Sequence, residues 1–227
     1  MDAISTAMPC LEDKLTATSR LLETLLARHD PARIAVAWTG GKDSTVVLDV
    51  WRQILAGSRV LAVNLDTGCK FPEILTLRDR LAAEWSLDLH ILRPDPADIP
   101  AVIAKDRIAC CRALKVMPLK RGLERLGIEA LLTGVRADEN PNRQDTAPLE
   151  DRDGYTQVNP IVSWTEMDVW AHTLARGLPY CTLYAEGYRS LGCMPCTKKS
   201  APGLSERSGR DQEKEARMAE LRALGYF

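Results

Sequence analysis

The chain has 227 residues, and its 30 basic and 31 acidic side chains give a formal net charge of -1. This length suits one sizeable α/β domain with a hydrophobic core that needs no disulfides. The balanced charge gives no support to a nucleic-acid partner, and no run of about 18 uncharged apolar residues indicates a membrane span. Because the N-terminus also lacks the pattern of a secretion signal, we expect a cytoplasmic protein.

The predicted elements alternate between helices and strands. Apolar residues at helical spacing from Leu11 to His29 predict an N-terminal helix that ends at Asp30 and Pro31. Apolar runs predict strands at 33–38, 60–65, 87–92 and 128–134, and 155–162 can add another; helical patterns cover 44–55, 72–85, 113–127 and 166–177. This alternation predicts a doubly wound, mostly parallel sheet with helices on both faces. Ligands of such sheets bind at the carboxyl ends of the strands.

A short glycine turn follows the first predicted strand. It reads Thr39, Gly40, Gly41, Lys42, Asp43 and Ser44, and the predicted helix begins directly after it. Unpaired backbone N–H groups and the positive end of a helix favour an anion there, and glycines let the backbone approach a phosphate closely. A Walker-type loop would carry Ser or Thr directly after its lysine, so this is a different phosphate loop or an ordinary turn.

The glycine turn resembles the pyrophosphate-binding loop of the adenine nucleotide alpha-hydrolase superfamily, with Thr39 in place of the usual serine. The resemblance implies that the turn holds a phosphate or sulfate group of an adenine nucleotide. Residues 65–81, "LDTGCKFPEILTLRDRL", resemble the corresponding part of sulfonucleotide reductases and of the small subunit of sulfate adenylyltransferase. Asp66, Thr67 and Gly68 would then contact the nucleoside, although these residue types also favour a plain turn at the end of a strand.

Four of the seven cysteines form two close pairs. Cys110 and Cys111 are adjacent, and Cys193 and Cys196 form a Cys-x-x-Cys motif. In a reducing compartment such thiols are first interpreted as metal ligands, and four of them suit either zinc or a [4Fe–4S] cluster. The pattern and its flanks, "CCRALKVMPLKRGL" and "GYRSLGCMPCT", resemble adenylyl-sulfate reductases of the iron–sulfur type. The resemblance implies a [4Fe–4S] cluster in preference to zinc, with Lys115 between the cluster and the sulfate.

Arginines in the polar stretches are candidates for binding sulfate or phosphate, since a guanidinium can donate two parallel hydrogen bonds to an oxyanion. The polar stretch 135–154 follows Gly134 and predicts a loop over the site. The candidate side chains are Arg136 and Arg143 in this stretch, and Arg207 and Arg210 in "SERSGR". Solvated loop charges are the alternative. We include Gly134 in the predicted nucleotide site.

The attacking thiol is where the resemblance fails. The reductases use the cysteine of a C-terminal Glu-Cys-Gly-(Leu/Ile)-His motif, whereas this sequence has no cysteine after Cys196. Cys69 is the candidate within the chain, because it follows the predicted nucleoside-binding residues and Lys70 is expected to lower its pKa. A thiol from outside the chain is the alternative. The last residues, "SERSGRDQEKEARMAELRALGYF", instead resemble the tail of the sulfate adenylyltransferase small subunit, which also ends in Gly-Tyr-Phe.

The combined prediction is an oxidoreductase of sulfate assimilation that converts adenylyl sulfate or its 3′-phospho form to sulfite and AMP or its 3′-phosphate. ATP-dependent adenylyl transfer and a non-catalytic nucleotide- or cluster-binding protein are the alternatives. We divide the chain into an N-terminal helix (1–30), an adenine-nucleotide-binding domain with the iron–sulfur site (31–200) and a charged tail (201–227). The expected partners are the adenine nucleotide and a thiol electron donor such as thioredoxin. The sequence does not decide between a monomer and a homo-oligomer.

Overall fold

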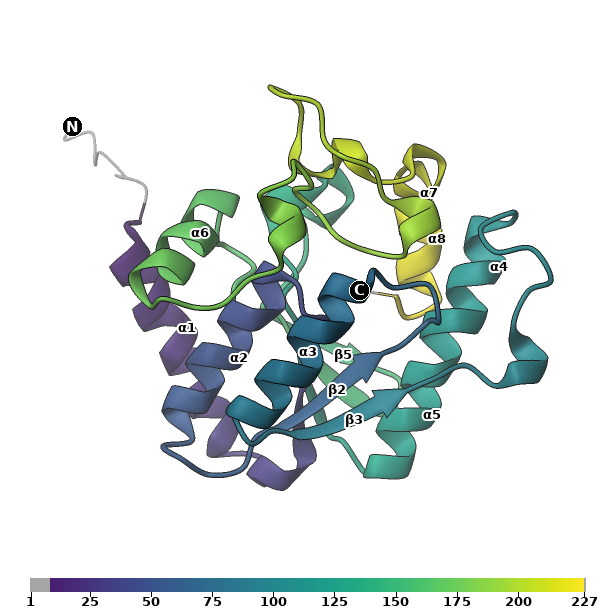
Figure 1. Ribbon diagram of the computed structural model, residues 1–227. Coiled ribbons are helices and arrows are strands. Elements are labelled where there is room, and N and C mark those ends of the chain that lie inside the picture. Colours follow the sequence, from purple (N-terminus) through teal and green to yellow (C-terminus); the bar gives the residue numbers. More distant parts are fainter. Residues whose placement is uncertain (1–8, 227) are drawn as a thin grey trace, which may run out of the picture.

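A six-stranded sheet forms the centre of the molecule in the computed structural model, which describes residues 9–226 (Figure 1). Its strand order is β3-β2-β1-β4-β6-β5, and only β5 runs antiparallel to its neighbour. The strands are β1 (Ile34–Ala37), β2 (Leu61–Leu65), β3 (Asp88–Leu92), β4 (Ala130–Leu132), β5 (Leu149–Arg152) and β6 (Tyr155–Val158). The predicted doubly wound, mostly parallel sheet is confirmed.

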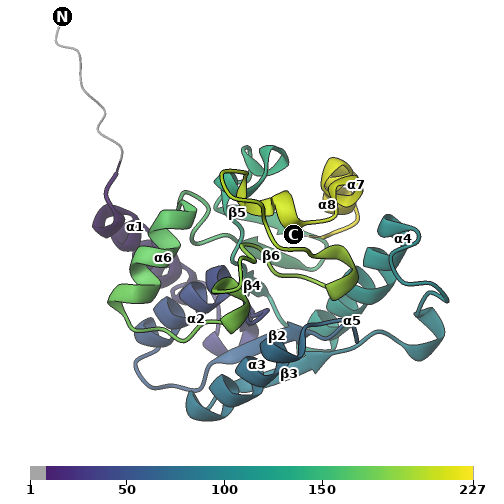
Figure 2. The ribbon, with the colours of Figure 1, turned by 45° about the horizontal axis from the view of Figure 1, so that its top comes forward.

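Helices cover both faces of the sheet (Figure 2). They are α1 (Leu11–Leu26), α2 (Lys42–Ile54), α3 (Pro72–Glu84), α4 (Arg107–Cys111), α5 (Met117–Leu126), α6 (Glu166–Ala175), α7 (Gln212–Ala216) and α8 (Met218–Ala223). In β1, Ile34 and Val36 pack with α1, α2, α3 and α6, whereas Ala35 and Ala37 pack with α5. Burial on both faces explains why β1 is a continuous apolar run rather than an alternating one.

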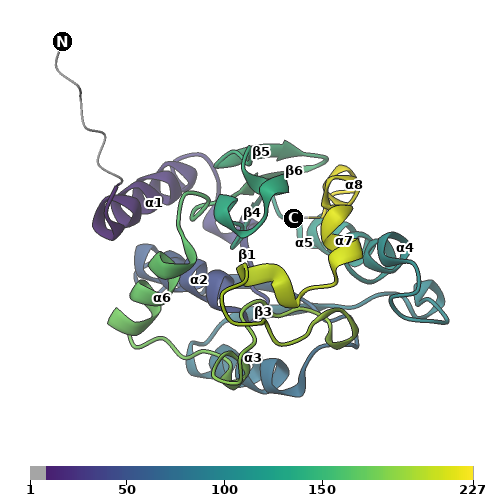
Figure 3. The ribbon, with the colours of Figure 1, turned by 90° about the horizontal axis from the view of Figure 1, so that it is seen from above.

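The order of the strands creates a crevice at the centre of the sheet. The chain runs from β1 outward through β2 to β3 and then returns to the other side of β1 as β4. Such a reversal leaves an opening at the carboxyl ends of the two central strands, where α/β proteins bind ligands. The glycine turn follows β1, and Gly134 follows β4. The C-terminal segment, defined as residues 205–226, lies across this edge in the view from above (Figure 3).

Two regions differ from the predicted elements. The polar stretch 135–154 is more ordered than a plain loop: it contains 3-10 turns at Ala137–Glu139 and Pro141–Arg143, and then β5, which pairs with β6 through a turn at Gly154. The predicted helix 113–127 consists of a π-helical turn at Arg112–Val116 followed by α5, and the helical stretch begins earlier than predicted, with α4. Single π-helical turns within α-helices often lie at functional sites. Here the π-helical turn directly follows the cysteine pair and carries Lys115.

The ends of the chain are only partly described. Residues 1–8 and 227 lie outside the described range. The predicted division at residues 30 and 200 stays a prediction. Within residues 9–226, no helix is both long and apolar enough to cross a membrane.

Candidate functional site

The glycine turn is held by its own side chains. Gly40 has a φ of +79°, a conformation that glycine adopts without strain. The Thr39 N–H donates to Ser44 Oγ at 3.1 Å, and the Gly41 N–H donates to Thr39 Oγ1 at 3.2 Å. Because α2 begins at Lys42, the positive end of its dipole faces the turn. The predicted strand, glycine turn and helix are therefore present in this order.

Gly134 lies directly against this turn. A Cβ atom at Gly134 would stand 2.7 Å from Ser44 N and 2.9 Å from the carbonyl carbon of Asp43. Both of these are backbone atoms, so a side chain at this position would have to push the turn away. The absence of a side chain at Gly134 thus fixes how closely the turn approaches the end of β4.

Buried ion pairs link the turn to the C-terminal segment. Lys42 Nζ lies 2.5 Å from Glu206 Oε1 and 3.1 Å from Asp43 Oδ2. Arg136 donates to Asp43 Oδ1 at 2.7 Å and also pairs with Glu206. Burial alone would lower the pKa of Lys42, but the carboxylates of Asp43 and Glu206 raise it above its ordinary value. Lys42 therefore stays charged and holds the C-terminal segment onto the turn.

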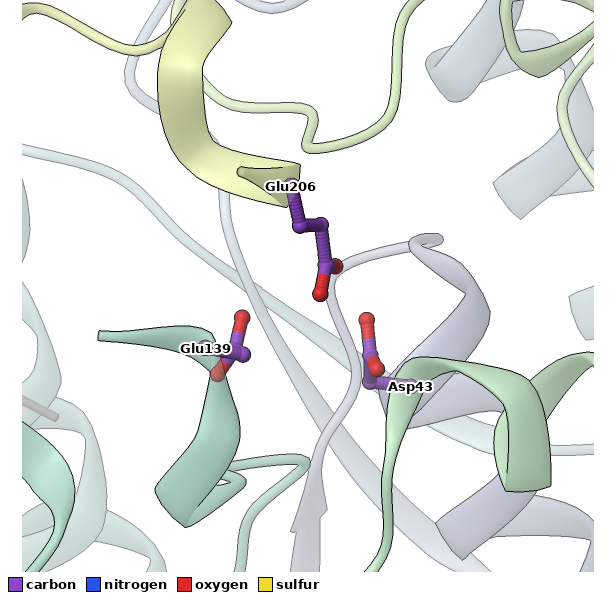
Figure 4. A group of neighbouring side chains, drawn as sticks. All are labelled: Asp43, Glu139 and Glu206. Carbon is purple, nitrogen blue, oxygen red and sulfur yellow. The ribbon is translucent and has the colours of Figure 1, made fainter. Parts of the chain in front are cut away.

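Three carboxylates converge in this network. Oxygens of Asp43, Glu139 and Glu206 lie within 4.8 Å of one another, and the three side chains point together from three separate segments (Figure 4). Glu139 is paired with Arg143 and, at 3.2 Å, with Arg207. Since each carboxylate already has a cationic partner, we interpret the group as an ion-pair network rather than as a metal site.

A group of cations lies beside the cysteines. Lys115 Nζ and Lys214 Nζ donate to the Tyr226 hydroxyl at 3.3 and 3.1 Å. Burial and the charge of Lys115 lower the pKa of Lys70 to about 8. Burial would raise the pKa of Tyr226, but Lys115 and Lys214 lower it to about 6. Arg210 donates Nη1 to Ser190 Oγ at 3.3 Å, while its buried Nε has no hydrogen-bond partner within the described chain. We call Lys70, Lys115, Arg210 and Lys214 the cationic group.

The two cysteine pairs meet next to this group. Cys110 and Cys111 end α4, and Cys193 and Cys196 flank a 3-10 turn. An antiparallel bridge joins Cys193 to Lys70, and the Thr67 hydroxyl lies 3.3 Å from Cys193 Sγ. A charge on Cys193 raises the pKa of Cys110 and of Cys196, in both cases after the larger effect of burial. The four predicted ligands are therefore electrostatic neighbours, as a shared metal centre requires.

Cys69 differs from its prediction. Burial, and then the charges of Cys193 and Cys110, raise its pKa, so the expected lowering by Lys70 is not found. Neighbouring residues of an extended segment point in opposite directions, and it is Lys70 that lines the central cavity, whereas Cys69 does not. The other two cysteines are Cys10, which is exposed, and Cys181, which is buried in the core.

A cavity of about 150 Å³ connects the glycine turn to the cationic group. Of the predicted nucleotide- and sulfate-binding residues, it is lined by Thr39, Gly41, Asp43, Ser44, Lys115, Gly134, Arg143, Arg207 and Arg210. The predicted residues Gly40, Lys42, Asp66, Thr67, Gly68 and Arg136 lie outside its lining. Asp66 instead accepts hydrogen bonds from Gly68 N–H and Arg93, at 3.1 and 3.2 Å.

Sequence reasoning missed several residues of this site. They are Glu139, Tyr184, Glu206, Lys214 and Tyr226. Glu206 stands directly before the predicted Arg207, but no spacing indicates that its carboxylate reaches Lys42. Tyr184 belongs to no recognisable motif either, yet its hydroxyl accepts a hydrogen bond from the Lys42 N–H at 3.0 Å.

Comparison with known proteins places this geometry in a family. The model of the phosphoadenosine phosphosulfate reductase domain matches residues 33–199, which span the sheet and all four clustered cysteines. The chain belongs to this family. It is 37% identical over 174 residues to the adenosine 5′-phosphosulfate reductase of Deinococcus radiodurans, covering 74% of this chain and 68% of that protein. It is 31% identical to the phosphoadenosine 5′-phosphosulfate reductase of Xanthomonas campestris pv. campestris, covering 92% and 93%.

A solved structure shows the same fold. The crystal structure of phosphoadenylyl-sulfate reductase from Candida auris superposes with a TM-score of 0.68 at 22% identity, covering 87% of this chain and all of the other. At the level of enzyme class, the reductases named above confirm the predicted oxidoreductase acting on a sulfonucleotide. They carry the names of two different substrates.

Proposed function

We propose that this protein reduces adenylyl sulfate or 3′-phosphoadenylyl sulfate to sulfite and the corresponding adenine nucleotide, and that it does so as a [4Fe–4S] enzyme. The observation that carries the proposal is the position of the cationic group. It borders both the cavity that begins at the glycine turn and the four clustered thiols. A sulfonucleotide has matching parts, a nucleotide for the turn and a sulfo group for buried cations.

The residues present fit an iron–sulfur cluster. Cys110, Cys111, Cys193 and Cys196 would bind it, because they supply the four thiol donors that such a cluster requires, and the charges of neighbouring cysteines in this group affect the pKa values of Cys110 and Cys196. When bound, the cluster would supply a charged metal–sulfur group beside Lys115. Burial alone would lower the pKa of Lys115, but Tyr226 and Cys193 raise it, so its ammonium stays charged next to the thiolates.

The cavity positions the substrate for attack by a thiolate on sulfur. A sulfur–sulfur bond forms while the sulfur–oxygen bond to the nucleotide breaks, and the electron pair leaves with the nucleotide phosphate. A second thiol of the donor then displaces sulfite and leaves a disulfide, and the thiol protons pass to water. Lys70, Lys115 and Arg210 would bind the sulfo oxygens and offset the negative charge that develops as the bond breaks.

We assign the attacking thiol to a dithiol donor outside this chain. Cys69 does not line the cavity, and its raised pKa disfavours the thiolate. We therefore expect Cys69→Ser to form sulfite at a rate within about twofold of the parent protein, given a dithiol donor. A loss of about a hundredfold or more, with the iron content unchanged, would instead identify Cys69 as the nucleophile.

The first experiment is anaerobic purification followed by iron and sulfide analysis and a sulfite assay. About four irons and four sulfides per chain are expected from four thiolate ligands. Sulfite should then appear from adenylyl sulfate or its 3′-phospho form only when a dithiol is present. One zinc per chain, or no sulfite from either nucleotide, would contradict the proposal.

Adenylyl transfer from ATP is the second candidate, because residues 205–227 resemble the tail of the sulfate adenylyltransferase small subunit. It requires that the glycine turn hold a pyrophosphate leaving group. We prefer the reductase, because the matching family model and the named relatives are reductases. Release of pyrophosphate from ATP in the presence of sulfate would reverse this preference.

A further inference from the structure

Tyr226 reaches the cavity because the chain reverses after α8. Gly225 has a φ of +94°, in the left-handed region that glycine adopts without strain. The Gly225 N–H donates to Arg222 O and the Tyr226 N–H donates to Leu221 O, both at 2.9 Å, so the helix ends in a tight glycine cap. This cap turns the tyrosine back toward the sheet, where it lines the cavity.

The Tyr226 oxygen occupies a position suited to an oxyanion. It accepts hydrogen bonds from two ammonium groups, Lys115 at 3.3 Å and Lys214 at 3.1 Å, which come from different segments. Lys70 and Arg210 line the same cavity, and Arg210 Nε is buried without a partner among residues 9–226. A sulfate or phosphate group carries several oxygens and could satisfy more of these donors than one hydroxyl does.

The size of the cavity indicates that something must move. Its volume is about 150 Å³. Pockets for small molecules and cofactors usually measure about 300–1,000 Å³, so a nucleotide needs more space than this. Tyr226 follows a helix of six residues and fills the side of the cavity nearest the cationic group. Its ring lines the cavity close to the end of the C-terminal segment, so displacement of the ring would enlarge the cavity there.

We propose that Tyr226 is a displaceable occupant of the sulfo-group subsite. Its displacement lowers the affinity only for nucleotides that carry a second oxyanion. This inference rests on the proposed function. Only a nucleotide with a second oxyanion beyond its α-phosphate can replace the tyrosine oxygen between Lys115 and Lys214. AMP lacks that group, so it binds without displacing Tyr226, whereas the sulfonucleotide substrate displaces it. The residue thereby weakens the binding of the sulfonucleotide and leaves the binding of AMP unchanged.

The test uses two unreactive probes with the cluster-loaded protein. ADP stands in for adenylyl sulfate, because its β-phosphate occupies the place of the sulfo group, and AMP lacks that group. Isothermal titration should show ADP binding about tenfold tighter to Tyr226→Ala than to the parent protein, since a charge-assisted contact no longer has to be broken. Tyr226→Phe keeps the ring and should tighten ADP by a smaller factor, while AMP should bind all three proteins equally.

Tyr180→Ala is the matched control, because Tyr180 is 42% exposed and does not line the cavity. It should leave the affinity for ADP unchanged. If ADP bound the parent and Tyr226→Ala equally, the displacement would be disproved while the nucleotide site stood. If the affinity for AMP increased in Tyr226→Ala as much as the affinity for ADP, the selective effect on nucleotides with a second oxyanion would be disproved. If neither probe bound either protein, the proposed function would fail and the inference with it.

Discussion

Single residues decide whether the site can form, and the cysteines are the clearest case. Cys193 is the best connected of them: it is bridged to Lys70, and its sulfur lies 3.3 Å from the Thr67 hydroxyl. Burial would raise its pKa, but Lys115 and the Thr67 hydroxyl lower it to about 7. Thiolate is the form that binds metals, so the lowered pKa of Cys193 favours its role as a metal ligand.

Cys193→Ala should abolish iron binding. Removing one of four thiolate ligands leaves a cluster incompletely held. The measurement is the iron and sulfide content after anaerobic purification. Cys181→Ala is the control, because Cys181 is a buried cysteine of the hydrophobic core on the opposite side of the sheet from α5. Iron content in Cys193→Ala equal to that of the control would disprove the ligand assignment.

Gly134→Ala should weaken nucleotide binding by about tenfold or more. Its Cβ would clash with the backbone of Ser44 and Asp43, and overpacking of this kind costs about 1–3 kcal/mol. Titration with AMP measures the effect. Gly154→Ala is a useful comparison, because Gly154 has a φ of +86° but a Cβ there would meet nothing within 4 Å. That variant should lose stability through backbone strain and keep the parent affinity for AMP.

At the scale of elements, the capped start of α6 connects two helices of the fold. α6 begins with a reciprocal cap: the Thr165 hydroxyl accepts the Asp168 N–H at 3.2 Å, and Asp168 Oδ2 accepts the Thr165 N–H at 2.7 Å. Lys14 of α1 lies 2.6 Å from the same carboxylate. The cap therefore joins two helices that cover one face of the sheet.

Thr165→Ala should destabilise the protein by about 1 kcal/mol, the usual value of a helix N-cap. For a chain of this length the melting temperature should fall by roughly 2–4 °C. Ser163→Ala is the control, since Ser163 is exposed and makes no cap. An equal decrease in both variants would show that the cap contributes nothing beyond a general loss of a hydroxyl group.

The elements were largely predictable because their causes are local. Buried strands give apolar runs, and capping residues such as Thr165 mark where a helix begins. β5 was missed because as an edge strand it is mostly charged, and its pairing depends on β6 rather than on its own sequence. The π-helical turn was missed because its residues fit an α-helix equally well.

The site was predicted only as far as its motifs reach. The glycine turn and the four cysteines have recognisable spacing. The structure places the turn in the lining of the cavity and Cys193 against Lys70, which also lines it. Glu206 and Tyr226 have no such spacing, because tertiary folding of the C-terminal segment over the sheet brings them there. Asp66 was expected at the nucleoside, but it does not line the cavity. It pairs instead with Arg93 at 3.2 Å and with Arg78 at 3.8 Å.

For the whole molecule, the C-terminal segment is attached by buried ion pairs as well as by the apolar side chains of Met218 and Leu221. Arg207 pairs with Glu139 at 3.2 Å and donates to both oxygens of Glu215 at 2.7 and 2.8 Å. Burial would raise the pKa of Glu139, but Arg143 and Arg207 hold it well below its ordinary value of 4.5. Charged carboxylates thus fasten residues 205–226 to the α/β body.

Acid should loosen this attachment. A carboxyl group with a lowered pKa stabilises the folded state fully above its unfolded pKa, near 4.5 for Glu139, and this contribution is lost as the pH falls through the folded value. We expect the melting temperature to decrease from about pH 5 downward. Glu139→Gln should be less stable at pH 7 and should lose less on acidification. The exposed Glu23→Gln should follow the parent; a Glu139→Gln curve parallel to the parent would contradict the assignment.

The glycine cap after α8 has a practical consequence for recombinant work. Because Tyr226 lines the cavity, an affinity tag fused after residue 227 would begin two positions after a residue of the proposed substrate site. Purification handles, fluorescent fusions and surface-immobilisation linkers at that end would compete with the nucleotide for space. Figures 1 and 3 show α1 well apart from α8, so an addition at the α1 end of the described chain would start farther from the C-terminal segment.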